Sequence, residues 1–220
     1  MHIAILKRAG AVLLTVGLLD IGLMIYCLAN KISYSSNLNI FAVIAGIFLM
    51  RGSLRAASIV RWLALFLLCA SAGMLIAWPM LQPIGLTLTQ LRLASGAIAQ
   101  SALLVVLMAA LLAWLVRTLG QPAVMEARAQ AGRKRRSTRL PAALGFGMVA
   151  ILVVVLVTAG RSASADRARD LATREVGANY RLHVASLNMR SGSAGTSYGA
   201  LVVAWNENEI RNIPVSWQEP

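Results

Sequence analysis

Histidine, cysteine and acidic side chains are scarce in this sequence of 220 residues, which holds two, two and eight of them respectively. No group of these residues has the close spacing that metal ligands need. No serine lies in the sequence context of an activated nucleophile. The sequence therefore predicts no catalytic residue, no metal site and no cofactor, and we expect a protein that is not an enzyme.

The two cysteines, Cys27 and Cys69, both lie inside apolar segments. At a rise of about 1.5 Å per helical residue, Cys27 falls near one surface of a membrane and Cys69 lies on the other side of its middle. This difference in depth argues against a disulfide between them. We expect two small packing residues.

Charged residues make up only 13% of the chain, against about 25% in soluble proteins, and hydrophobic residues make up 58%. The long apolar runs are Ala9–Ala29, Asn37–Met50, Ile59–Ala77, Ala97–Val116 and Ala142–Ala159. A helix needs about 20 apolar residues to cross a bilayer, with a minimum of about 17. The sequence predicts a five-helix transmembrane domain in residues 1–160. Residues 84–93 are too short to cross and are expected in the outer interface.

The second apolar run is the shortest, because its strictly apolar part is Ile40–Met50. A re-entrant segment is the alternative at this length. A crossing is favoured because Arg51, Arg55 and Arg61 follow the run and would otherwise lie on the wrong side of the membrane.

Basic residues are distributed unevenly between the loops of residues 1–160. Twelve Lys and Arg residues lie in the loops on one side of the predicted membrane domain. Two, Lys31 and Arg92, lie in the loops on the other side. Because basic loops stay in the cytoplasm, this bias predicts a cytoplasmic N-terminus and an extracytoplasmic segment after Ala159, as in a bacterial inner membrane. The net charge of +13 belongs mainly to these loops. We therefore expect no nucleic-acid partner.

One basic run lies immediately before the last apolar segment and comprises Arg133, Lys134, Arg135, Arg136 and Arg139. Such a cluster beside a membrane attracts anionic lipid headgroups by about 1 kcal/mol for each charge. The simpler interpretation, which we prefer, is an anchor that fixes the orientation of the last helix. In either case the cytoplasmic face of the bilayer is an expected partner.

Asp20 is the single acidic residue inside a predicted membrane helix, and it lies close to the middle of the bilayer. A charge at this depth is costly, so the residue is a candidate functional site facing the helix bundle. Packing through a hydrogen bond is the favoured role, and ion or proton handling is the alternative.

Residues 161–220 have a different composition and predict a small exported α+β domain, in which one helix packs on a three-stranded antiparallel meander. The helix is expected at Ser162–Val176, and Gly177 ends it. The first strand contains Leu182 and Val184, with His183 on the opposite, solvent-exposed face. Tyr198–Trp205 is apolar on both faces, which is typical of a central strand, and Ile213–Trp217 forms the last strand.

A domain of this size buries little core, so we expect it to dock on the membrane or on a membrane-protein partner. One face of the central strand would take the helix, and the other would need cover. The tryptophans Trp205 and Trp217 are the candidate partner-binding residues, because tryptophan is common at interfaces.

Three segments of residues 142–220 are similar to a known family: ARDLATREVG (Ala168–Gly177), YGALVVAW (Tyr198–Trp205) and IPVSW (Ile213–Trp217). Together with the single helix that precedes them, they resemble in layout the exported domains of the cytochrome oxidase assembly factor one family. The resemblance implies an assembly role. The first 120 residues look like a small bacterial inner-membrane protein.

The leading hypothesis is a non-enzymatic inner-membrane accessory or assembly protein that presents a small exported protein-binding domain. The alternative is a small transporter or an ion- or proton-handling membrane subunit centred on Asp20.

Overall fold

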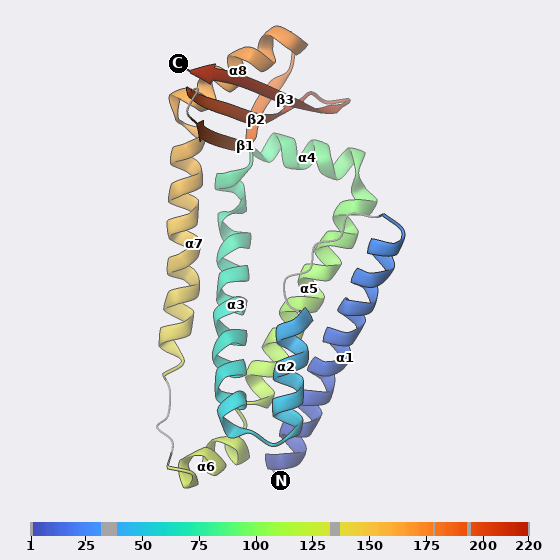
Figure 1. Ribbon diagram of the computed structural model, residues 1–220, viewed down its shortest axis with the longest axis vertical. Coiled ribbons are helices and arrows are strands. Elements are labelled where there is room, and N and C mark those ends of the chain that lie inside the picture. Colours follow the sequence, from blue (N-terminus) through green and yellow to red (C-terminus); the bar gives the residue numbers. More distant parts are fainter. Residues whose placement is uncertain (1, 32–38, 133–136, 178, 193–194, 220) are drawn as a thin grey trace. The chain divides into compact units, whose positions relative to one another are not determined.

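A computed structural model of the chain describes residues 2–31, 39–132, 137–177, 179–192 and 195–219 (Figure 1). The described chain is mostly helical and ends in a three-stranded antiparallel sheet. The helices are α1 (His2–Ala29), α2 (Asn39–Met50), α3 (Leu54–Leu81), α4 (Ile84–Leu93), α5 (Ser95–Thr118), α6 (Pro122–Gln130), α7 (Arg139–Gly160) and α8 (Ala163–Val176). The strands are β1 (Arg181–Gly192), β2 (Gly195–Trp205) and β3 (Ile210–Glu219).

Four helices in the described ranges are long and apolar enough to cross a membrane: His2–Ala29, Leu54–Leu81, Ile98–Thr118 and Arg139–Gly160. The helix α2 has 12 residues and is therefore about 18 Å long, which is less than the hydrocarbon thickness of about 30 Å. The chain is thus a membrane protein with four candidate spans. The expected count of five spanning helices is not confirmed, because α2 is too short to cross by itself.

The chain divides into two compact units. Unit 1 comprises residues 1–71 and 107–145, and unit 2 comprises residues 72–106 and 146–220. Each unit has its own packing, and they are described in turn.

In unit 1, α1 and α2 pack antiparallel at backbone contact. A β-carbon added to Gly10 would lie 2.7 Å from the carbonyl oxygen of Gly46, and one added to Gly46 would lie 2.9 Å from the carbonyl oxygen of Gly10. Both distances are too short for any side chain, so these glycines permit the contact. Gly10 and Gly46 therefore form the close contact between α1 and α2. At Gly22, in contrast, an added β-carbon would meet nothing within 4 Å.

A second close approach in unit 1 involves α7 and α3. A β-carbon on Gly145 would lie 2.6 Å from the carbonyl oxygen of Phe66 and 3.1 Å from the β-carbon of Cys69. Gly145 is therefore a packing residue. Both cysteines are free thiols, which agrees with the prediction of no disulfide.

In unit 2, residues 84–93 form the helix α4, which connects the candidate spans α3 and α5. Ile84, Leu88 and Leu91 share one face of this helix and are 65%, 61% and 51% exposed. Leu86 lies on another face and is only 1% exposed. A short helix with a solvent-accessible apolar face, set between two spans, fits the interfacial position that the sequence predicts.

The sheet of unit 2 has the order β1-β2-β3, and both pairs are antiparallel. Tyr198–Trp205 lies within β2, so the prediction of a central strand is confirmed. In the register, Val202 pairs with Val184 and Ile213, whereas Val203 pairs with His183 and Asn212. A bulge interrupts β1 between Val184 and Ser186.

One face of the sheet packs against α8, as expected. Small, aliphatic and aromatic side chains from the helix and the strands form this core: Ala168, Ala172, Ala200, Val202, Ala204, Ile213 and Trp217. The opposite face was expected to need cover from the membrane surface or a partner. Part of it is covered instead by α4 of the same chain, because Leu86 packs against Val203, Trp205 and Ile210.

Candidate functional site

The two tryptophans that the sequence singles out as partner-binding candidates are largely buried. Trp205 is 6% exposed and packs beneath Leu86 of α4. Trp217 is 9% exposed, and its ring stacks on that of Tyr198 with a centroid distance of 5.3 Å. Both residues are therefore parts of the core, and each contributes only an edge to a neighbouring pocket.

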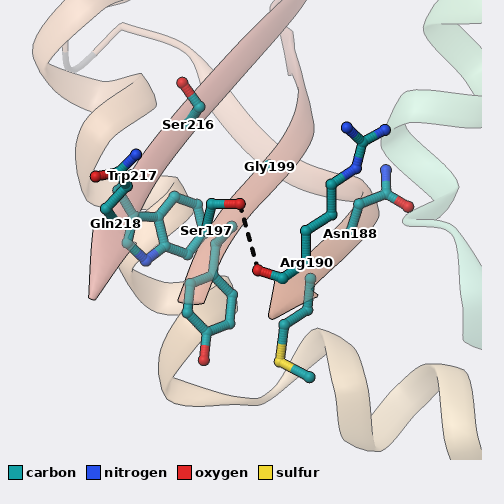
Figure 2. A pocket seen from close by; sticks show the side chains of 9 residues that line it. Asn188, Arg190, Ser197, Gly199, Ser216, Trp217 and Gln218 are labelled. Carbon is teal, nitrogen blue, oxygen red and sulfur yellow. Dashed lines mark hydrogen bonds between the residues drawn. The ribbon is translucent and has the colours of Figure 1, made fainter. Parts of the chain in front are cut away.

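The pocket beside Trp217 is a groove of about 630 Å³ at one end of the sheet (Figure 2). We call it the strand-end groove, and its lining comes from all three strands: Asn188, Met189, Arg190, Ser197, Tyr198, Gly199, Ser216, Trp217 and Gln218. Successive residues of a strand point to opposite faces, so a lining of three consecutive residues per strand extends around the sheet end to both faces. The groove therefore offers apolar and polar surface side by side.

Exposure differs among the side chains of the strand-end groove. Met189 is 65% exposed, whereas the stacked rings of Tyr198 and Trp217 are largely covered. The hydroxyl of Ser197 donates to the carbonyl oxygen of Arg190 at 3.3 Å and ties β2 to β1 at this end. The indole nitrogen of Trp217 is buried without a hydrogen-bond partner. The groove thus combines a rigid aromatic base with a flexible, accessible methionine.

A polar cluster fixes the turn between β2 and β3 at the other end of the sheet. The hydroxyl of Tyr180 donates to Glu209, and the guanidinium of Arg211 donates to the same carboxylate at 3.1 and 3.2 Å. The hydrogen bond from Tyr180 lowers the pKa of Glu209, and it raises the pKa of Tyr180. The guanidinium of Arg211 also lies over the Tyr180 ring at 5.6 Å from its centroid. This cluster is structural, because its members satisfy one another.

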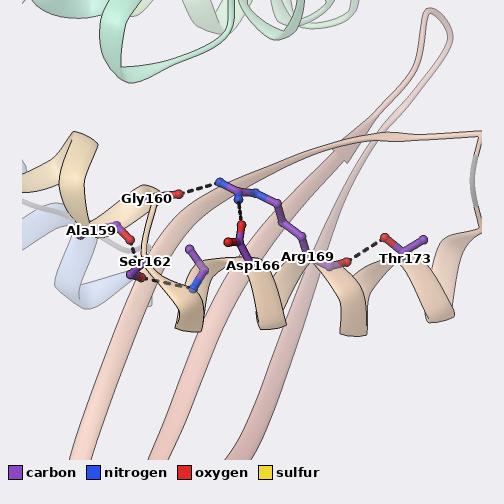
Figure 3. Close-up of polar contacts among 7 residues, drawn as sticks. Ala159, Gly160, Ser162, Asp166, Arg169 and Thr173 are labelled. Atoms are coloured by element: carbon purple, nitrogen blue, oxygen red, sulfur yellow. Dashed lines mark hydrogen bonds and ion pairs between the residues drawn. The ribbon is translucent and has the colours of Figure 1, made fainter.

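The joint between α7 and α8 positions the sheet at the end of a candidate span (Figure 3). The hydroxyl of Ser162 accepts from the backbone N–H of Ala165 at 3.3 Å and donates to the carbonyl oxygen of Ala159 at 2.7 Å. The guanidinium of Arg169 donates to the last residue of α7, Gly160, at 2.6 Å and pairs with Asp166 at 2.5 Å. These contacts satisfy backbone groups that the helix ends would otherwise leave unpaired.

His183 was expected on a solvent-exposed face but is half-buried on the α4 side of the sheet, opposite Val203. Burial lowers the pKa of His183, and the positive charge of Arg169 lowers it further. The burial of His183 differs from the expectation because β1 pairs with the central strand β2, and both faces of β2 are covered.

The remaining candidate residues are Asp20 and the basic residues at the start of the last membrane helix. Asp20 is half-buried on α1, and the apolar cavity of about 90 Å³ in unit 1 is lined without it. Of the predicted lipid-contacting residues, Arg139 is exposed at the first residue of α7. Arg133, Lys134, Arg135 and Arg136 lie outside the described residues.

Unit 1 contains an arginine cluster that the sequence did not reveal. Arg128 of α6 is 7% exposed and donates to the hydroxyl of Ser58 on α3 at 2.8 Å. Arg61 of α3 contacts the sulfur of Met125 on α6 at 3.2 Å. The sequence shows Arg61 beside Trp62 at one end of a predicted membrane helix. No local pattern links Arg61 to Arg128. The cluster ties α6 to α3.

In the described part of the chain, no group of three or more His, Cys, Asp or Glu side chains is arranged to hold a metal ion. In the strand-end groove, exposed and aromatic side chains from all three strands lie together. The chain matches no protein family model, no curated protein and no solved structure.

Proposed function

We propose that this protein is a non-enzymatic accessory or assembly protein of a bacterial inner membrane, which presents its C-terminal sheet as a protein-binding surface on the extracytoplasmic side. The strand-end groove supports this proposal most directly. Its exposed Met189, its aromatic base of Tyr198 and Trp217, and Arg190 belong to the residue types that are enriched in protein interfaces.

The strands offer a second element of recognition. Because the sheet order is β1-β2-β3, β1 pairs with β2 on one side only, so it is an edge strand of the described sheet. An extended peptide can add to such an edge through backbone hydrogen bonds, with neighbouring side-chain pockets supplying specificity. The other edge, β3, carries Pro214, which removes one backbone donor. We assign the partner segment to the β1 edge and the groove next to it.

The orientation follows from the distribution of basic residues. With the N-terminus in the cytoplasm, the end of α2 lies on the cytoplasmic side, where Arg51 and Arg55 follow it. The contact between Gly10 and Gly46 supports this arrangement, because it sets the end of α2 beside the start of α1. Reporter fusions at Asn37 and Ser53 test it: opposite sides are expected, and the same side for both would show a re-entrant segment.

Site-specific photocrosslinking tests the binding surface. A photoreactive amino acid at Met189 in the full-length protein is expected to form an adduct of defined mass with a membrane-protein partner. The matched control is the same group at Thr173, which is exposed on α8 outside the groove. Adducts from both positions, or from Thr173 alone, would remove the groove from the proposal. A deletion of residues 161–220 that leaves the set of copurified proteins unchanged would refute protein binding by the sheet domain.

A further inference from the structure

A second cavity in unit 2 lies between α4 and the end of the sheet, on the face opposite α8. We call it the α4–sheet cavity. Its volume is about 570 Å³, and it is lined by Gly85, Leu88, Thr89, Arg92, Asn179, Arg181, Trp205, Asn206 and Glu207. It shares no residue with the strand-end groove. Its lining combines two cationic side chains, one carboxylate, amides and an indole.

Gly85 brings two nitrogen donors together in this cavity. A β-carbon added to Gly85 would lie 3.6 Å from a terminal guanidinium nitrogen of Arg181 and 3.8 Å from the indole nitrogen of Trp205. Both donors therefore lie beside the start of α4. Arg92 adds a second guanidinium from the last turn of the same helix. Two guanidinium groups and an indole N–H around one cavity favour an anion with several oxygens, such as a phosphate diester.

The carboxylate of the cavity belongs to a turn whose backbone is held by hydrogen bonds. The side-chain oxygen of Asn206 accepts from the backbone N–H groups of Asn208 and Glu209 at 2.8 and 2.9 Å. The backbone N–H of Asn206 donates to the carbonyl oxygen of Glu209 at 3.1 Å, which closes the turn. Glu207 lies in this turn, is exposed and lines the cavity. A ligand that carries a cation as well as a phosphate would match both signs of charge in the lining.

The third component is apolar. Leu88 lines the cavity and also belongs to the exposed face of α4, together with Ile84 and Leu91. Because α4 joins the ends of two candidate spans, this face lies where hydrocarbon meets headgroups. A ligand that reaches the cavity past Leu88 arrives from the lipid phase.

We propose that the α4–sheet cavity binds the headgroup of a membrane phospholipid of the phosphoethanolamine class. Arg92 and Arg181 hold the phosphate, the indole N–H of Trp205 donates to it, Glu207 accepts from the ammonium group, and the acyl chains leave along Leu88. A phosphoglycerol headgroup would leave Glu207 facing a ligand without a cation. A phosphocholine headgroup would bring a quaternary ammonium that donates no hydrogen bond. The site requires membrane insertion and is independent of the groove assigned to protein binding.

Native mass spectrometry of the full-length protein in mild detergent tests this site. The delipidated protein is titrated with phosphatidylethanolamine, phosphatidylglycerol and phosphatidylcholine that carry identical acyl chains. One retained phosphatidylethanolamine is expected, with affinity about tenfold higher than for the other two lipids. Retention of phosphatidylglycerol or phosphatidylcholine with equal or higher affinity would overturn the assignment. Competition by soluble glycerophosphoethanolamine at matched concentration would also overturn it, because the ligand would then be the free headgroup.

Substitutions separate the contribution of the two arginines from the contribution of Glu207. Arg92→Gln with Arg181→Gln is expected to lower phosphatidylethanolamine affinity by about tenfold or more, because both phosphate contacts are lost. Glu207→Gln is expected to abolish the preference for ethanolamine over choline while lipid is still retained. Arg174→Gln and Glu175→Gln, both exposed on α8, are the matched controls and should behave as the wild type.

A further variant tests whether a loss of lipid binding is caused by unfolding. Gly85→Leu fills the cavity without removing a charge, and its fold is checked by hydrogen exchange in β2. A folded Gly85→Leu protein that no longer retains the lipid supports the site. Unchanged retention in this variant, or in the double arginine variant, would refute it.

Discussion

The face of the sheet that α8 covers is closed by small side chains, whereas the face that α4 covers keeps a cavity with charged side chains. On the α8 face, Ala168 and Ala172 pack on Ala200, Val202 and Ala204, and each of them is at most 6% exposed. On the α4 face, Val203 and Trp205 meet a single buried leucine, Leu86. The same central strand therefore supports two kinds of packing.

The two covering helices differ in composition. Alanines on α8 allow the helix to approach the sheet closely, and the polar remainder of α8 remains in solvent. The helix α4 is apolar on two sides, so it contacts the sheet with Leu86 and exposes Ile84, Leu88 and Leu91 on the other side. One face thus stabilises the domain, and the other joins the sheet to a helix with an exposed apolar side. Substitutions on the two faces separate these roles.

The largest effect is expected for Val202→Asp, on the α8 face. Val202 is fully buried, so an aspartate there places an unpaired carboxylate in the core and costs about 4 kcal/mol or more. A domain of this size has a total stability of roughly 3–9 kcal/mol. We expect the sheet and α8 to lose protection in hydrogen-exchange measurements while the membrane helices stay protected.

Two variants define the contrast around Val202→Asp. Val203→Asp, on the α4 face, should also unfold the sheet domain but with a smaller loss, because fewer groups pack there and Val203 is 8% exposed. Asn212→Asp places a carboxylate at an exposed neighbouring position and should change little. A larger loss for Val203→Asp than for Val202→Asp would reverse the assignment of the two faces.

The next effect concerns Leu86→Ala, which removes the contact of α4 with the sheet. Truncation of a buried leucine costs about 2 kcal/mol or more. We expect faster hydrogen exchange in α4 and in the second half of β2, with α8 unchanged. Leu91→Ala, at an exposed position of the same helix, is the control and should have no effect on the sheet. Equal loss of protection in α8 would show that the two faces do not separate.

A smaller effect is expected for Ser162→Ala at the start of α8. Loss of the cap to the N–H of Ala165 costs about 1 kcal/mol. The first turn of α8 should exchange faster, and its later turns and the α4 face should not. Ser164→Ala, two positions later, removes a hydroxyl without removing the cap and serves as the control. A variant in which α4 loosens before α8 would contradict the local role of the cap.

The packing of α8 on the sheet could be predicted from the sequence. The packing of α4 on the opposite face of the sheet could not. The central position of β2 followed from a strand whose two faces are apolar, and α8 followed from apolar residues along one helical face and a glycine after them. Both signals are local. The contact of Leu86 with Val203 joins residues far apart in the sequence, and no pattern in either segment indicates the other.

The same reason explains what the sequence missed in the candidate sites. Trp205 and Trp217 were chosen for their residue type, but their burial depends on α4 and on stacking with Tyr198. The Arg61 and Arg128 cluster depends on the position of α6 against α3, which loop sequences do not specify. The second apolar run was interpreted as a span from the charges that follow it, although its helix covers 12 residues.

The smallest expected effect is a pH dependence that only the α4 face carries. Burial, followed by the charge of Arg169, holds the pKa of His183 below its ordinary value of 6.5. The unfolded chain therefore binds this proton more readily than the folded chain, and stability falls as the pH decreases from about 6.5 towards the lower pKa of the folded state. We expect His183→Gln to flatten the stability of β1 and β2 in this range, measured by hydrogen exchange corrected for intrinsic rates. Glu209 has a lowered pKa, so its contribution is complete above its ordinary value of 4.5 and is lost only as the pH falls below that value. A Glu209→Gln variant should therefore keep the wild-type slope between pH 7 and 5.5, and the same slope in His183→Gln would show that burial on the α4 face has no consequence for this histidine.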